Sequence, residues 1–176
     1  MLSFTKNENT TIDPDWSREK IYKWWSPGRQ LLKSIRQYQK WKTKGGVLGN
    51  LISKYYVLTH RFWSVVSGAD IPLNCQLGGG LLLLHPQGIV IHPEAVIGVN
   101  CAIFQQVTIV KSVKIGHGVL IGAGAKILSN ATIGDYAKVG ANAVVLNNSY
   151  IPPKATAVGI PARIILPSDQ SFLDSQ

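Results

Sequence analysis

The sequence has few charged residues and no long apolar run, and each shortage excludes a class of protein. Charged residues make up 15% of the 176 residues and hydrophobic residues 45%, so most of the chain has the apolar content of a packed protein rather than of a disordered one. The only continuous apolar run of note, residues 81–84, is far shorter than the roughly 20 residues that cross a bilayer. The polar N-terminus lacks the pattern of a signal peptide, so we expect a cytoplasmic protein.

Acidic residues are also scarce, and their distribution divides the chain. The nine Asp and Glu face 18 Lys and Arg, and residues 1–69 hold twelve of the basic residues but four of the acids. All five tryptophans lie in the same part: Trp16, Trp24, Trp25, Trp41 and Trp63. We therefore predict a basic, Trp-rich, α-helical region over residues 1–69, a β-domain over residues 70–165 and a polar tail over residues 166–176.

A repeat of six residues runs from Ile91 to Thr156. Every sixth position is aliphatic and β-branched, eleven times without exception: Ile91, Ile97, Ile103, Ile109, Ile115, Ile121, Ile127, Ile133, Val139, Val145 and Ile151. A small or short side chain follows four places later, and Cys75 and Cys101 occupy such positions, so packing accounts for both without a disulfide. Neither a helix nor a strand has this period, whereas short parallel strands joined by tight corners do. The repeat predicts a parallel β-helix.

The N-terminal region is expected to form helices. Asp13 or Asp15 can cap a helix that starts near Trp16, and two longer helices are predicted over residues 29–42 and 47–66. The default interpretation is a cap that packs on the β-helix or on a neighbouring subunit. Alternatives are peripheral contact of residues 16–63 with an anionic membrane and electrostatic guidance of CoA or a phosphorylated carrier. No nucleic-acid-binding motif accompanies the positive charge, so we expect no nucleic-acid partner.

The repeat is disturbed once, beside a histidine. Before Ile91 the hexads run in another phase, through Ile71, Leu77 and Leu83, and two extra residues are needed between Leu84 and Ile91. An irregularity in a strict repeat is a frequent place for function. With three hexads to a coil, residues 18 apart stack, which gives one apolar side (Val110, Leu128, Leu146) and two sides rich in glycine. This arrangement suggests association about a three-fold axis.

Four segments of the chain resemble the hexapeptide-repeat acyltransferases, which have a left-handed parallel β-helix, and among them most of all the serine acetyltransferase branch. They are residues 70–72 (DIP), 83–90 (LLHPQGIV), 119–128 (VLIGAGAKIL) and 157–164 (AVGIPARI). The resemblance implies a homotrimer with active sites between subunits and acetyl-CoA as the donor, without a metal.

The resemblance also implies a catalytic pair. His85 matches the family's general base and Asp70 the aspartate that orients it, fifteen residues upstream. A hydroxyl is a poor nucleophile until a group with a pKa of about 6.5 removes its proton during attack on the thioester, and a carboxylate behind the imidazole stabilises the imidazolium that forms. The alternative for His85 is a turn histidine at the repeat irregularity.

Further positions follow from the same comparison. The donor's pantetheine arm is expected along Gly122, Ala123, Gly140 and Ala141, with Arg163 and Lys154 near the adenosine 3′-phosphate; for the glycines and alanines, coil geometry alone is the alternative. His92 could line the acceptor pocket, whereas His117 and His60 are expected on the surface. No two histidines have the spacing of a related zinc-binding β-helix family, so we expect no metal site.

Two departures from the serine enzymes affect the expected acceptor. Leu84 stands where they have an acidic residue, and the hexads run straight through residues 109–114, where they have a loop with an Asp-Arg-His segment. The main hypothesis is therefore an acetyl-CoA-dependent O-acetyltransferase that acts on a sugar or polysaccharide precursor. Serine O-acetylation and a non-catalytic β-helix scaffold are the alternatives.

Overall fold

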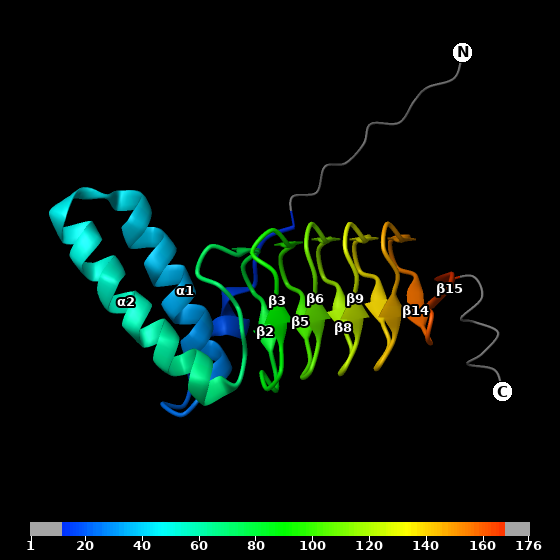
Figure 1. Cartoon of the computed structure of the whole chain (residues 1–176), viewed down its shortest axis with the longest axis horizontal. Coiled ribbons are helices and arrows are strands. Elements are labelled where there is room, and N and C mark those ends of the chain that lie inside the picture. Colours follow the sequence, from blue (N-terminus) through cyan, green and yellow to red (C-terminus); the bar gives the residue numbers. More distant parts are fainter. Residues whose placement is uncertain (1–11, 168–176) are drawn as a thin grey trace, which may run out of the picture.

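The computed structural model describes residues 12–167, which form a parallel β-solenoid with a helical hairpin at its N-terminal end (Figure 1). The predicted parallel β-helix is therefore confirmed. The helices are η1 (Trp16–Glu19), α1 (Pro27–Lys44) and α2 (Gly46–Ser67). The predictions for residues 1–11 and for most of the polar tail lie outside the described residues.

Three sheets form the sides of the solenoid, and each coil contributes one short strand to each sheet. Sheet A contains β3 (Val90–Ile91), β6 (Thr108–Ile109), β9 (Lys126–Ile127) and β12 (Val144–Val145). Sheet B contains β1 (Gln76–Leu77), β4 (Val96–Ile97), β7 (Lys114–Ile115), β10 (Thr132–Ile133) and β13 (Tyr150–Ile151). Sheet C contains β2 (Leu82–Leu83), β5 (Ala102–Ile103), β8 (Leu120–Ile121), β11 (Lys138–Val139), β14 (Thr156–Val158) and the antiparallel β15 (Arg163–Ile165).

The strand register locates the irregularity of the repeat. Gln76 pairs with Val96 and Leu82 with Ala102, both 20 residues apart. From Val90 onward the offset is 18 residues, as in the pairing of Val90 with Thr108. The two extra residues therefore lie between β2 and β3, as predicted, in the turn that carries His85.

The repeated aliphatic residues form the core. All eleven of them, from Ile91 to Ile151, are at most 4% exposed. At many corners the residue before the small inward side chain has a positive φ, and asparagine recurs there, as at Asn100, Asn130 and Asn142. Asparagine and glycine tolerate this left-handed conformation best, so the sequence favours a sharp corner where the fold needs one.

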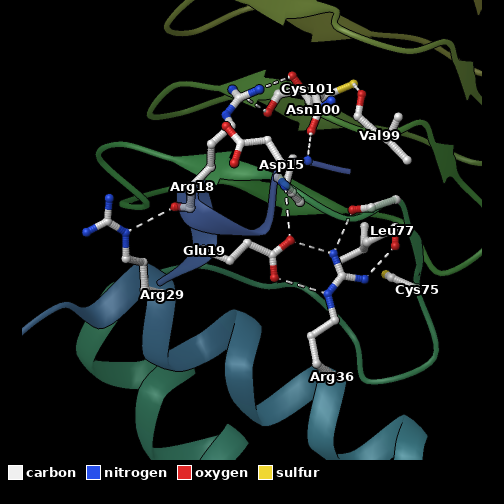
Figure 2. A network of polar contacts seen from close by, with 12 residues as sticks. Asp15, Arg18, Glu19, Arg29, Arg36, Cys75, Leu77, Val99, Asn100 and Cys101 are labelled. Carbon is white, nitrogen blue, oxygen red and sulfur yellow. Dashed lines mark hydrogen bonds and ion pairs between the residues drawn. The ribbon is translucent and has the colours of Figure 1, made fainter. Parts of the chain in front are cut away.

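An N-terminal strap, residues 13–20, crosses the first coils and ties them to α1 (Figure 2). Asp15 caps η1 through its side chain, as expected, and its backbone N–H donates to the side chain of Asn100. Glu19 forms an ion pair with Arg36 of α1 (2.9 Å) and also accepts the backbone N–H of Leu81. Arg36 in turn donates to two backbone carbonyls of the solenoid, those of Leu77 and Gly78.

The hairpin covers the open end of the solenoid with α1. Leu31, Leu32 and Ile35 are buried and belong to the same core cluster as the first coil. Both long helices extend slightly beyond their predicted limits, because Pro27 begins α1 and Gly45 and Gly68 end the two helices. Ser26 precedes α1 without a side-chain capping bond, since its hydroxyl donates to Lys23 instead. No helix in the described part of the chain is long and apolar enough to cross a membrane.

Candidate active site

The turns that lead from sheet C into sheet A form one edge of the solenoid, which we call the C–A edge. It consists of four turns: residues 84–89, 104–107, 122–125 and 140–143. Residues 159–162 join β14 to the antiparallel β15 within sheet C, and their backbone bonds to Val144 extend the same edge. Backbone hydrogen bonds join consecutive turns, as from Gly124 to the carbonyl of Gln105 and from Asn142 to that of Ala123. Because neighbouring strands lie roughly 4.8 Å apart, equivalent residues of these turns form a column along the solenoid.

His85 lies in the first turn of the C–A edge and is exposed. This turn contains the two-residue insertion, which makes it longer than the regular corners below it. Its second half is fixed by backbone bonds from Gly88 to Gly68 and from Ile89 to Pro86. The imidazole is therefore held at the one irregular corner, accessible to a substrate.

The predicted donor-binding residues lie on the same edge. Gly122 and Ala123 belong to its third turn, and Gly140 and Ala141 to its fourth. A Cβ on Gly122 would lie 2.7 Å from the backbone nitrogen of Ala141, and one on Gly140 would lie 2.8 Å from Val158. Close packing of the coils is therefore enough to explain both glycines without a bound donor, which is the alternative stated from the sequence.

The two predicted phosphate contacts are separated. The segment before Arg163 returns to the C–A edge. There the N–H of Val144 donates to the carbonyl of Gly159, and the N–H of Ala162 donates to the carbonyl of Val144. Arg163 begins β15 and is exposed at the C-terminal end of this edge. Lys154 lies at the corner between sheets B and C, across the width of sheet C, so the backbone does not bring it to the same edge.

Asp70 lies near the His85 turn, but its side chain is not hydrogen-bonded to the imidazole. Its backbone pairs with Ile89 and Ile91, immediately after the turn. In the described part of the chain no hydrogen bond or ion pair joins the side chains of Asp70 and His85. The pairing of these two side chains, which the family resemblance implies, therefore stays a prediction, and the backbone bonds bring the two residues to neighbouring parts of one coil.

His92 shares a hollow of about 230 Å³ with Asp70, on the side formed by sheet A. The Nδ1 atom of His92 accepts the backbone N–H of Glu94, a geometry that requires the proton of a neutral imidazole to be on Nε2. His92 thus lines a hollow beside the predicted catalytic aspartate.

Leu84 borders a second hollow, of about 290 Å³, between the His85 turn and the start of α1. Trp25 and Pro86 line the same hollow. Leu84 is 46% exposed and Trp25 58% exposed, so both present an apolar surface to solvent directly beside the turn. The predicted substrate contact of Leu84 therefore has an aromatic neighbour from the N-terminal region that the sequence analysis did not assign.

Gln105 is a further candidate that the sequence analysis missed. It lies on the C–A edge one coil after His85, and its Oε1 atom is buried without a hydrogen-bond partner among the described residues. Buried polar atoms are nearly always paired, so an unpaired acceptor needs an explanation. The sequence contained one sign of this: Gln105 occupies a corner position at which the next two coils have alanine, Ala123 and Ala141.

The described residues contain no cluster of three or more side chains that could hold a metal ion. The two cysteines are free and buried. Burial raises the pKa of Cys75 to about 12, and the negative charge of Asp70 adds to that rise. Both thiols are therefore protonated packing residues, as their place in the repeat predicts.

Comparisons with known proteins agree with this architecture. Residues 112–147 match the family described as bacterial transferase hexapeptide (six repeats). A probable serine acetyltransferase 1 of Oryza sativa subsp. japonica is 48% identical over 108 residues, which are 57% of this chain and 35% of that protein. The serine acetyltransferase of Escherichia coli K12 is 44% identical over 110 residues, 58% of this chain and 40% of that protein.

Solved structures give the same result. A serine acetyltransferase in complex with CoA superposes with a TM-score of 0.67 at 36% identity, covering 81% of this chain and 58% of that one. Neisseria gonorrhoeae serine acetyltransferase in complex with serine gives a TM-score of 0.65 at 34% identity, over 81% of this chain and 58% of that one. This chain thus spans 35% to 40% of the length of the two curated relatives. Residues 112–147 thus carry hexapeptide repeats of this family, and the solenoid is similar to those of serine acetyltransferases.

Proposed function

We propose that this chain is an O-acetyltransferase that uses acetyl-CoA and acts at the C–A edge. The observation that carries the proposal is the column that runs from His85 through Gln105 and the small residues at 122–123 and 140–141 to Arg163. A base at one end and a cation at the other, with small side chains between them, fit an extended thioester that ends in phosphate. The similarity to a serine acetyltransferase in complex with CoA supports the same donor.

In the proposed reaction the acceptor hydroxyl attacks the carbonyl carbon of the thioester. His85 takes the hydroxyl proton as the carbon–oxygen bond forms, and Asp70 stabilises the imidazolium. The carbon–sulfur bond then breaks, and the proton passes to the sulfur of CoA as the free thiol leaves. Gln105 supports donor binding, because its unpaired Oε1 can accept an amide N–H such as those of the pantetheine arm.

L-serine is the acceptor to test first. The relatives are named serine acetyltransferases, which favours serine over the sugar that the sequence analysis put first. A sugar or polysaccharide hydroxyl is the second candidate, because the hollow beside His85 is lined by Trp25 and Leu84. An aromatic and aliphatic wall suits the apolar side of a sugar ring better than the two charges of a free amino acid.

Release of CoA thiol tests the chemistry. Purified full-length protein is incubated with acetyl-CoA and with L-serine or a panel of sugar acceptors. His85→Ala should lower the rate by about 10²–10⁴. His117→Asn is the control, since its amide oxygen can still accept the backbone N–H that His117 accepts from Val99. Full activity of His85→Ala with the true acceptor would refute the mechanism.

We also propose a homotrimer, with the apolar residues of sheet A at the contact. Val90 of that sheet and Leu146, which directly follows its strand β12, are exposed in the single chain, which supports such a contact. Light scattering of the purified protein measures the mass of the assembly. Peripheral contact of residues 16–63 with an anionic membrane is a separate proposal that does not depend on the chemistry at His85.

A further inference from the structure

Helix α2 carries an apolar stripe along its outer side. The stripe consists of Leu48, Leu51, Tyr55, Leu58, Phe62 and Val65, each between 55% and 84% exposed. Their spacings alternate between three and four residues, so they lie on one side of the helix for its whole length. An apolar stripe of this width normally faces a protein core.

The other described residues leave this stripe uncovered. The buried residues of α2 are Gly49, Ser53 and Ser67, which lie on the other side of the helix. On that side His60 bonds through Nε2 to the backbone carbonyl of Ile71 in the solenoid. The hairpin also projects from the end of the solenoid, with its tip away from the coils (Figure 1). The stripe is therefore presented to the surroundings.

The charge around the stripe is of one sign. Residues 20–69 contain ten Lys and Arg and no Asp or Glu. Lys54 and Arg61 flank the stripe on one side of α2, and Lys40, Lys42 and Lys44 are exposed near the hairpin tip. Two exposed tryptophans, Trp24 and Trp25, add to the apolar surface of this region. Apolar, aromatic and basic side chains without acids match the surface of an anionic bilayer.

The same charge argues against two hairpins packed face to face through this stripe. Two hairpins packed through this stripe would bring two sets of basic residues together without acids to compensate them, and like charges at such a contact are repulsive. A layer of anionic headgroups compensates them and accepts the apolar side chains.

We propose that α2 lies on an anionic membrane surface with its apolar stripe inserted below the headgroups. This inference sharpens the peripheral contact proposed for residues 16–63 and is independent of acetyl transfer. The end of α2 is joined to the His85 turn by the backbone bond from Gly88 to Gly68, so membrane binding through α2 would also anchor this turn. Each basic residue near the surface strengthens binding roughly fivefold at low salt.

Sedimentation with vesicles tests the inference. Full-length protein is mixed with vesicles of phosphatidylcholine and phosphatidylserine, and with phosphatidylcholine alone. We expect binding to the anionic vesicles that weakens as salt increases. Leu51→Glu and Leu58→Glu should each weaken it by at least about tenfold, because each removes a leucine that the bilayer would bury. Asn50→Glu is the matched control: it adds the same charge to the same helix outside the stripe and should weaken binding less.

Other outcomes would overturn the inference. Failure to bind anionic vesicles, or equal loss in Leu51→Glu and Asn50→Glu, would exclude insertion of the stripe. Light scattering of the same proteins without lipid tests whether a second copy of the chain covers the stripe. A smaller assembly in Leu51→Glu would assign the stripe to that contact. CoA release by each variant separates this question from catalysis, because α2 is not in the proposed site and activity should be retained.

Discussion

Substitution of Gln105 by leucine should separate stability from donor binding. The Oε1 atom of Gln105 is buried on the C–A edge without a partner in the described structure. An unpaired buried acceptor costs about 1–3 kcal/mol of desolvation, and an apolar group of similar size does not carry that cost. Leucine at this position should therefore leave the free protein as stable as before, or more stable by up to about 1 kcal/mol.

The effect on the donor should have the opposite sign. If Oε1 accepts an amide N–H of acetyl-CoA, its loss leaves that donor group unpaired in the complex. The expected cost of about 1–2 kcal/mol corresponds to a KM for acetyl-CoA that is roughly five- to thirtyfold higher. The kcat at saturating donor should change little, because the bond is made equally in the ground state and the transition state.

Two measurements on one variant decide between the explanations. Urea unfolding gives the free energy of unfolding, and the thiol-release assay gives KM. Gln76→Leu is the control, since the same change is made at an exposed position of sheet B and should alter neither quantity appreciably. A loss of more than about 1 kcal/mol in Gln105→Leu, or an unchanged KM, would refute the assignment.

Three further predictions concern the scaffold. Arg36→Met removes the counter-ion of the Glu19 carboxylate and should cost about 3 kcal/mol of unfolding free energy. Since all five tryptophans lie in residues 1–69, their fluorescence during urea unfolding reports this part directly. Burial raises the pKa values of Cys75 and Cys101 from 9.0 to about 12 and about 11. The folded state then holds two protons that the unfolded state loses, so the free energy of unfolding should fall as pH rises above about 9, and thiol reagents should label these cysteines only in denaturant. Ile121→Ala, at a fully buried hexad position, should lower the free energy of unfolding by about 2–5 kcal/mol in the same assay.

Much of the site depended on contacts that no sequence pattern contains. The column from His85 to Arg163 follows from the 18-residue coil, so its members could be named in advance. Lys154 was placed with them from the family resemblance, although the same 18-residue count puts it with Tyr136 and Gly118 at the corner between sheets B and C. The contribution of Trp25 to the hollow beside Leu84 could not be predicted, since α1 packs on the solenoid through contacts between residues some sixty positions apart.

The sequence by itself determined the solenoid. A period of six with a β-branched residue always in the same place can bury its apolar residues in one way only, and the two extra residues before Ile91 can only lengthen a corner. Only the tertiary structure showed which polar and apolar groups are buried and which are exposed. Whether Gln105 has a partner, and whether the stripe on α2 is covered, depends on which surfaces meet after folding, because burial is a property of the packed chain and not of its local pattern.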